Sequence, residues 1–166
     1  MGSLTFERSL VMGIDPGLTG AIAILNVKDP KNPFIVDVFD TPTFEINGKK
    51  QMNLQLLTTQ VENHALTIRR ALIEDVFVMT GKESRGSMFN FGRVFGQVEG
   101  VVSSFNIPLH HTKPAVWKSV LGLGRDKNQS RQMASRLFPS EAKRFEKKKD
   151  DGRAEAVLLA MLASRI

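Results

Sequence analysis

Four acidic residues lie in places where an ordinary folded core would not accommodate a negative charge. Asp15 ends a short apolar run, and Glu74 lies within another. Asp151 and Glu155 are four residues apart, so on a helix they would share one face. Carboxylates that are crowded together repel one another unless cations neutralise them. Hard cations such as Mg²⁺ prefer carboxylate and phosphate oxygens, and a pair of such ions supports the hydrolysis of phosphodiesters.

Each acid also has a purely structural explanation. Asp15 could be a turn residue, and Glu74 could lie on the solvated face of an edge strand. The acids of the last segment could complement the dipole of a helix N-terminus, where Asp150 is an alternative to Asp151. Asp75 follows Glu74 directly and points to the opposite side of a strand, so we expect it to be a surface charge. The presence of all these acids in one basic chain favours a shared metal site.

The composition limits the classes of protein that the chain can represent. The 166 residues carry a formal net charge of +6, so polyanions such as nucleic acids are natural partners. The absence of cysteine excludes disulfides, thiolate zinc sites and a cysteine nucleophile. No apolar run approaches the roughly 20 residues of a membrane span, and the start has no secretory or transit signature. We therefore expect a soluble intracellular protein of a bacterial or phage-infected cytoplasm, or of an organelle matrix if a transit peptide precedes this sequence.

Apolar patterning predicts the elements that position these residues. Strands are expected at 10–14, 20–25, 34–39, 72–79 and 107–111. Helices are expected at 54–68 with Asn53 as the cap, at 87–105, 116–121 and 129–138, and from 150 to the end. The glycine-rich turn at 15–20 predicts a hairpin of the first two strands, and the polar segment 41–52 predicts a connecting loop. We expect an α/β fold in one domain over residues 1–166, with a mixed central sheet flanked by helices and a flexible or tag-derived start at 1–8.

The acidic segments and several others resemble those of RuvC-type Holliday junction resolvases. The acidic segments are 12–17 (MGIDPG), 71–76 (ALIEDV) and 151–156 (DGRAEA). Three further segments are similar to those of the phage and chloroplast branch of this family, namely 87–92 (SMFNFG), 116–118 (VWK) and 130–139. The resemblance covers roughly residue 11 to the C-terminus. It implies a ribonuclease H-like fold.

The resemblance also implies an activity and a set of site residues. It implies a homodimeric crossover junction endonuclease that uses Mg²⁺, or Mn²⁺ as a substitute, to nick two opposing strands symmetrically. By position, the catalytic residues and the ligands of two metal ions would be Asp15, Glu74, Asp151 and Glu155. The bacterial enzymes carry two aspartates three residues apart in the last helix, whereas Asp151 and Glu155 are four apart, as in the chloroplast branch, where a histidine stands at the position of Asp151. This departure leaves Asp150 and Asp151 as alternatives, and the spacing favours Asp151.

Basic and aromatic residues near the acids are candidates for DNA binding. Lys82, Arg85 and Phe89 follow the strand that carries a candidate ligand, and Phe89 could stack on an unpaired base or simply begin the core face of its helix. The other candidates are Lys118, Lys127, Arg131, Lys147, Lys148 and Lys149. The polar segment 41–52 is our candidate for base readout. Trp117, the only tryptophan, could pack in the core or stack on a base.

The expected helix 87–105 has two faces of different character. Six apolar residues recur three and four apart, namely Met88, Phe91, Phe95, Val98, Val102 and Phe105. Gly92, Gly96 and Gly100 lie on another face at four-residue spacing, where each costs roughly 1 kcal/mol relative to alanine. Close approach of a backbone explains such glycines, either within the chain or across the two-fold interface of a dimer.

Other functions agree with part of the sequence. A ribonuclease H acting on RNA–DNA hybrids and a general debranching nuclease would use the same metal chemistry. A non-catalytic junction-binding protein would leave the acids unused. Actin-like ATPases and sugar kinases also open with a strand, an aspartate and a glycine turn. They need a second phosphate-binding loop and a second domain, for which 166 residues leave no room.

Overall fold

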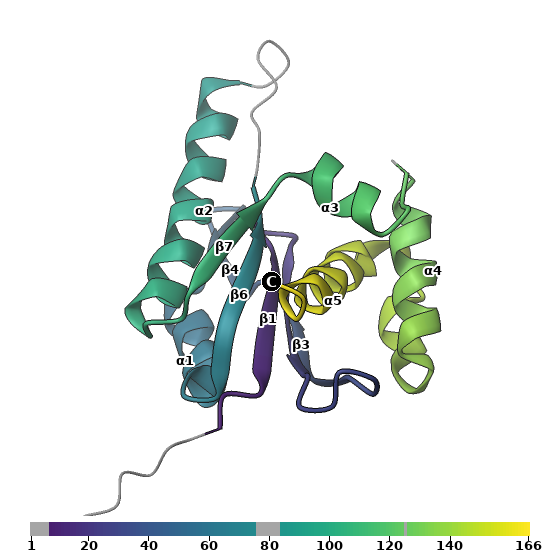
Figure 1. Ribbon diagram of the computed structural model, residues 1–166. Coiled ribbons are helices and arrows are strands. Elements are labelled where there is room, and N and C mark those ends of the chain that lie inside the picture. Colours follow the sequence, from purple (N-terminus) through teal and green to yellow (C-terminus); the bar gives the residue numbers. More distant parts are fainter. Residues whose placement is uncertain (1–6, 76–83, 125) are drawn as a thin grey trace, which may run out of the picture.

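The computed structural model describes residues 7–75, 84–124 and 126–166 (Figure 1). Five strands form one sheet in the order β3-β2-β1-β6-β7. Their bounds are β1 Leu10–Asp15, β2 Ala21–Asn26, β3 Phe34–Asp40, β6 Ile68–Glu74 and β7 Leu109–Thr112. β2 is antiparallel to β1 and β3, whereas β6 is parallel to β1 and β7. The expected hairpin at the start and the expected mixed sheet are both confirmed.

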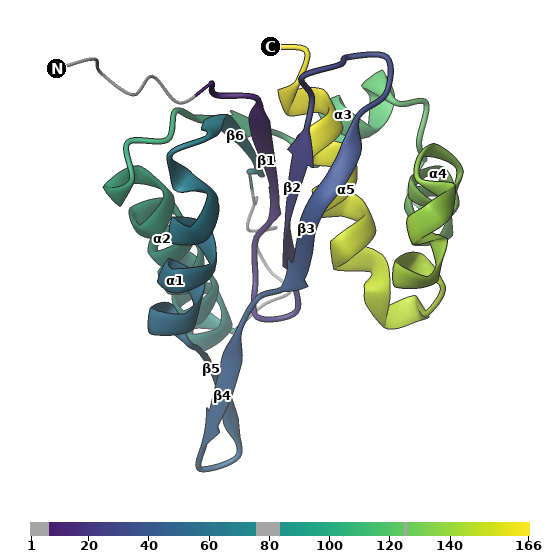
Figure 2. The same cartoon turned by 90° about the horizontal axis from the view of Figure 1, so that it is seen from below.

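Helices cover both faces of this sheet (Figure 2). One face packs against α1 Leu54–Ala65 and α2 Arg85–Ser104. The other face packs mainly against α5 Asp151–Ala163, beyond which lie α3 Pro114–Val120, α4 Lys127–Leu137 and the short 3-10 segments η1 Pro139–Phe145 and η2 Lys148–Asp150. Each face has its own buried apolar cluster. The expected α/β architecture is therefore confirmed.

The central strand β1 carries residues for both clusters. Val11 belongs to the cluster on the α5 side, and Met12 and Ile14 belong to the cluster on the side of α1 and α2. Between them, Gly13 lies directly against α5, because a Cβ there would be 2.0 Å from the carbonyl oxygen of Ala156. Any side chain at this position would push the helix off the strand. The glycine therefore allows the close approach of β1, which ends at Asp15, and α5, which carries Asp151 and Glu155.

The polar segment 41–52 forms a hairpin, so the prediction of a connecting loop was wrong. Its strands are β4 Thr43–Ile46 and β5 Lys49–Met52, and the hairpin extends away from the main sheet (Figure 2). Asn47 and Gly48 form the turn with φ angles of 52° and 70°. An Asn-Gly pair is the preferred sequence for a two-residue turn with positive φ at both positions. The sequence signal was present, but the polar composition of the flanking residues outweighed it.

The end of α1 and the start of β6 also differ from the prediction, which placed them at residues 68 and 72. The expected helix 54–68 ends at Ala65, because Ile68 is buried in the sheet opposite Leu10 as the first residue of β6. Asn53 caps α1 as expected, since its side chain accepts a hydrogen bond from the backbone N–H of Leu56. The expected strand end at 76–79 lies outside the described residues. No helix in the described part of the chain is long and apolar enough to cross a membrane.

Candidate active site

Three of the predicted acids meet at one edge of the sheet. Asp15 and Glu74 are the last residues of β1 and β6, which are parallel neighbours, so their side chains leave the sheet at the same edge. Glu155 reaches this edge from α5, which packs across the two strands. Each residue offers one carboxylate oxygen, and these three oxygens lie within 4.8 Å of one another. The fold thus brings together residues that are far apart in the sequence.

The chemistry of this donor set fits a hard divalent cation. Ligand oxygens lie about 2.0–2.6 Å from Mg²⁺ or Ca²⁺, so oxygens up to about 5 Å apart can bind one ion. All three donors are carboxylates, and Glu155 is only 4% exposed. A buried cluster of negative charges is costly without a compensating cation. These residues could hold a metal ion without rearrangement of the backbone.

Asp151 lies near this group, but it is not one of the three. It begins α5 and lines a cavity that the three acids also line. Its Oδ1 lies 2.8 Å from Nε of Arg131, as an ion pair whose geometry is not that of a hydrogen bond. Asp150 is buried, and its Oδ2 accepts a hydrogen bond from the backbone N–H of Lys147 at 2.8 Å. Asp150 therefore stabilises the turn before α5, whereas Asp151 lines the cavity, and its role as a metal ligand stays a prediction.

Two neighbouring residues of α3 bind two of the acids. The indole Nε1 of Trp117 donates a hydrogen bond to Oε2 of Glu74 at 2.5 Å. Nζ of Lys118 lies 2.9 Å from Oε1 of Glu155, to which the Oγ of Ser130 also donates, at 3.4 Å. Core packing was one of the two expectations for Trp117, and its side chain is indeed 1% exposed. Its contact with an acid was not predicted from the sequence.

The acids form the floor of an open cavity of about 650 Å³ with a basic rim. Four lysines contribute to the lining, namely Lys50, Lys118, Lys148 and Lys149. Lys50 comes from the hairpin strand β5, and Lys148 and Lys149 come from η2 just before α5. A cavity lined by both carboxylates and ammonium groups suits a phosphate ester that contacts metal ions and cationic side chains.

Two contacts hold the start of α5 in place. Arg153 donates two hydrogen bonds of 2.6 Å to Asp40 at the end of β3, and this contact raises the pKa of Arg153 above its usual value. Gly152 faces the turn after β1. A Cβ at this glycine would lie 3.0 Å from Oδ2 of Asp15 and 3.1 Å from the carbonyl oxygen of Thr19. The lack of a side chain at 152 therefore leaves room for a candidate ligand.

The predicted DNA contacts before and within α2 lie on the surface where the structure describes them. Arg85 is exposed in the first turn of α2, and Phe89 is 71% exposed. Phe89 is therefore not the first core residue of its helix, so that alternative was wrong. Lys82 lies outside the described residues. The exposed ring remains available for stacking on a base or on another protein.

The other predicted DNA contacts differ in their surroundings. Lys118 is directed at Glu155, so its ammonium group already belongs to the acid cluster. Lys147 is exposed and holds Asp150 through its backbone. Lys127 begins α4, but its side chain lies outside the described part of the structure. The basic residues thus divide into those that hold the acids and those that face solvent.

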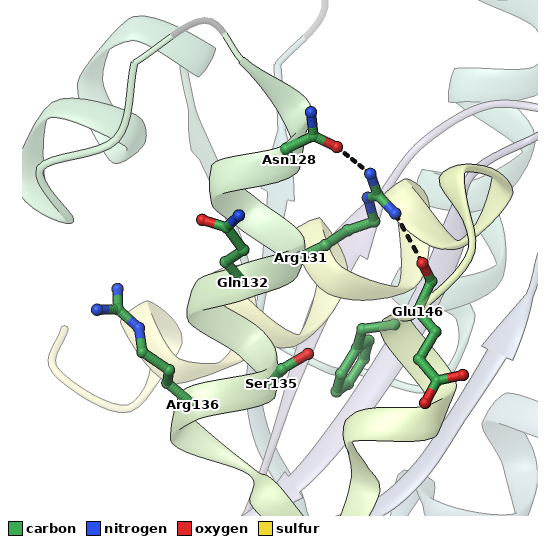
Figure 3. A pocket seen from close by; sticks show the side chains of 7 residues that line it. Asn128, Arg131, Gln132, Ser135, Arg136 and Glu146 are labelled. Atoms are coloured by element: carbon green, nitrogen blue, oxygen red, sulfur yellow. Dashed lines mark hydrogen bonds between the residues drawn. The ribbon is translucent and has the colours of Figure 1, made fainter.

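Arg131 contacts Asp151 of the cavity and also lines a second hollow, between α4 and the segment of Phe145 and Glu146 (Figure 3). This hollow has a volume of about 560 Å³. The guanidinium group donates to the carbonyl oxygen of Glu146 at 2.9 Å and to the side-chain oxygen of Asn128. With Asp151 on its other side, Arg131 is held by three segments of the chain. In the described structure Arg131 contacts an acid, and its contact with DNA stays a prediction.

The two faces of α2 differ as the sequence suggested, but the apolar face is used within the chain. Val98 and Val102 are buried, and Phe95 and Phe105 pack against the same cluster. The glycines on the other face, Gly92, Gly96 and Gly100, are exposed. A Cβ at any of these three positions would meet no atom within 4 Å. Packing inside the described chain therefore does not explain the glycines.

The sequence matches no protein-family model and no curated protein. Solved structures are similar in fold. RuvC from Thermus thermophilus, in complex with a Holliday junction substrate, has a TM-score of 0.64 at 16% identity, over 92% of this chain and 90% of that one. The fowlpox virus Holliday junction resolvase has a TM-score of 0.57 at 12% identity, over 94% and 97%. The yeast mitochondrial Holliday junction resolvase has a TM-score of 0.56 at 16% identity, over 96% and 79%. The expected ribonuclease H-like fold is confirmed.

Proposed function

We propose that this chain is a divalent-metal-dependent endonuclease that resolves four-way DNA junctions by nicking two opposing strands symmetrically. The observation that carries the proposal is the meeting of Asp15, Glu74 and Glu155 beneath a basic rim. The similar structures are Holliday junction resolvases, one of them in complex with a junction, which supports the same substrate. The resemblance of the sequence motifs to the phage and chloroplast branch supports a more specific placement within these enzymes.

The acids would act as metal ligands. Asp15, Glu74 and Glu155 would hold Mg²⁺, or Mn²⁺ as a substitute, and Asp151 would complete a site for two ions on release from Arg131. When bound, the ions would activate a water molecule and neutralise the charge that develops on the scissile phosphate. The strand ends and the buried helix α5 provide rigid supports, which such geometry requires.

The surrounding side chains would hold the DNA. Lys148 and Lys149 at the rim would neutralise phosphates on either side of the scissile bond. Lys82, Arg85, Lys127 and Lys147 would extend this contact along the junction arms, as proposed from the sequence. The hairpin β4–β5 starts beside the cavity, and its exposed Phe44 and Ile46 make it a candidate for contact with bases.

We also propose a homodimer built from one such domain in each chain. Symmetric nicking of two strands needs two active sites related by a two-fold axis. The open glycine face of α2, with Gly92, Gly96 and Gly100, would allow a second helix backbone to approach closely. Phe89 lies on this same face by helical spacing, so it could contribute either to the interface or to base stacking.

The direct test is cleavage of a labelled synthetic four-way junction, with a linear duplex and an RNA–DNA hybrid as controls. We expect paired symmetric nicks on the junction in Mg²⁺ and no product with a chelator. Cleavage of the hybrid with an intact junction would replace the proposal with a ribonuclease H. Cleavage of flaps and three-way branches as readily as four-way junctions would favour a general debranching nuclease. Binding of the junction without any cleavage would leave a non-catalytic junction-binding protein.

A further inference from the structure

The contact between Trp117 and Glu74 links the hydrophobic core directly to the acid cluster. The indole ring is 1% exposed and belongs to the same buried cluster as Leu72 and Phe138. Its N–H is directed out of this cluster and reaches Oε2 of Glu74 at 2.5 Å. An indole N–H can only donate, so the oxygen that it contacts must act as an acceptor. A buried tryptophan N–H needs a partner, and here the partner is a candidate metal ligand.

This hydrogen bond holds one carboxylate oxygen of a side chain that has several possible rotamers. Glu74 is the last residue of β6 and is partly exposed, and a glutamate side chain has three rotatable bonds. Repulsion by Asp15 and Glu155 would favour rotamers that turn its carboxylate away from the cluster. The rigid indole opposes that movement, because the ring cannot shift without disturbing the core.

Lys118, the next residue of α3, contacts another acid of the cluster. Lys118 lies 2.9 Å from Glu155, and its Nζ is 5.1 Å from the centre of the Trp117 ring. Two consecutive residues of α3 therefore hold acids from β6 and from α5. The short helix α3, which carries no candidate ligand, thus contacts two of the candidate ligands.

We propose that Trp117 is a positioning residue whose indole N–H orients Glu74 for metal binding. The proposal rests on the proposed function, because it assigns Glu74 the role of a metal ligand. Hydrogen-bond partners of metal ligands typically contribute 10- to 100-fold to metal affinity or activity. Trp117 is such a partner, and its effect should appear in the binding of Mg²⁺ even in the absence of DNA.

The test compares the variant Trp117→Phe with the wild-type protein by calorimetric titration of Mg²⁺ without DNA. Phenylalanine keeps an aromatic ring in the core and removes only the N–H and part of the ring volume. We expect Mg²⁺ affinity to fall about 10-fold or more, and the Mg²⁺ concentration for half-maximal junction cleavage to rise by a similar factor. Phe138→Leu is the matched control, because it reduces another buried ring of the same cluster that has no polar atom. Its thermal stability should fall while its Mg²⁺ affinity stays at the wild-type value.

Fluorescence provides a second measurement on the unmodified protein. The chain has one tryptophan and no tyrosine, so its emission comes from Trp117. Titration with Mg²⁺, which is diamagnetic, should change this emission, and the midpoint of the change should equal the midpoint found by calorimetry. Glu74→Gln should shift that midpoint to a higher Mg²⁺ concentration.

The outcomes separate this inference from the proposed function. Unchanged Mg²⁺ affinity in Trp117→Phe, or an equal loss in Phe138→Leu, would reduce Trp117 to a packing residue. If the wild-type protein binds Mg²⁺ but does not cut junctions, the proposed function fails while the calorimetric comparison still decides the role of Trp117. If the wild-type protein does not bind Mg²⁺ in the absence of DNA, the inference about Trp117 fails, and the cleavage of labelled junctions still decides the proposed function.

Discussion

Glycines in α5 and α2 occur for opposite reasons. In α5, a Cβ at Gly152 would meet Asp15 and the backbone of the turn after β1 at about van der Waals contact or closer. In α2, a Cβ at Gly92, Gly96 or Gly100 would meet nothing. Most residues of α5 are buried, whereas four of the twenty residues of α2 are. Packing within the chain explains the glycine of α5, whereas packing among the described residues does not explain those of α2.

Under the proposed function, this difference separates the proposed metal site from the proposed dimer interface. Helix α5 supplies acids to a site whose supports are all internal to the chain. Helix α2 contributes to the core through one face and leaves the other face open. Disturbing α5 should therefore damage metal binding and cleavage in each subunit, whereas disturbing the open face of α2 should damage only what depends on a second subunit.

The largest effect is expected at the acids. Glu155→Gln, Asp15→Asn and Glu74→Gln should each lower junction cleavage by well over about 100-fold, the upper range for residues that merely support metal ligands. Binding of the junction in a chelating buffer, measured by gel shift, should stay close to the wild-type value. Glu62→Gln, at an exposed position of α1, is the matched control and should cut normally. Lost binding with retained cutting would contradict the assignment of these acids.

A smaller effect is expected when alanine replaces the glycine of α5. Gly152→Ala forces a methyl group towards the Asp15 carboxylate and should cost about 1–3 kcal/mol in the free energy of unfolding. Junction cleavage should also fall, because the carboxylate must move. Gly96→Ala is the same change on the open face and should leave the folded subunit intact or stabilise it by about 0.5–1 kcal/mol. Equal destabilisation of the two variants, measured by denaturant unfolding, would remove the contrast between the helices.

Assembly should respond to a larger side chain on the open face of α2. Gly96→Leu should shift the protein from dimer to monomer in sedimentation velocity, because a leucine would separate the two helix backbones. The monomer should still bind Mg²⁺ in calorimetry, but paired nicking should fall by about 10-fold or more, since 1.4 kcal/mol of interface energy corresponds to a factor of ten. Glu62→Leu adds the same side chain to an exposed position of α1 and should remain dimeric. A wild-type protein that is monomeric at working concentration would show that this face has another partner.

The smallest effect on junction cleavage is expected at Gly48, in the turn of the β4–β5 hairpin. Gly48 in the hairpin turn has a φ of 70° and open space around it, so alanine there would be strained by its backbone alone. Gly48→Ala should cost about 1–2 kcal/mol within the hairpin. We expect junction affinity at constant salt to fall only a few-fold, with cleavage of bound junction unchanged. Gly48→Asn, which tolerates positive φ better, should be nearer to wild type, and unchanged affinity in both variants would argue against DNA contact by the hairpin.

The sequence predicted the acids better than it predicted their partners. Asp15 and Glu74 stand out because each interrupts an apolar pattern, and local pattern is visible along the chain. Lys118 and Arg131 were predicted to bind DNA because they are basic, and the structure adds a contact of each with an acid that the sequence did not indicate. These contacts join elements that meet only through the topology, and no periodicity encodes them. The need of a buried indole for an acceptor was the one available signal for Trp117, and it could not identify which acceptor.

For the fold as well, features that show a local pattern in the sequence were predicted better than features that lack one. Strands and helices with clear apolar periodicity were placed within a few residues of their observed bounds. The hairpin at 43–52 was missed because its strands are polar and short, and only the Asn47-Gly48 turn indicated it. The end of α1 was misplaced because Ile68 continues the helical spacing while belonging to the sheet.

The contact of Gly13 with α5 has a consequence for the protein as it is being synthesised. Asp15 and Gly13 emerge from the ribosome early, whereas Glu155 is added only after most of the chain has been made. At roughly 5–20 residues per second, the early acids wait on the order of ten seconds for the helix that completes their cluster. During that time the three carboxylates are not close together, because Glu155 is missing. Under the proposed function, a nascent or prematurely terminated chain without α5 would therefore lack the assembled metal site.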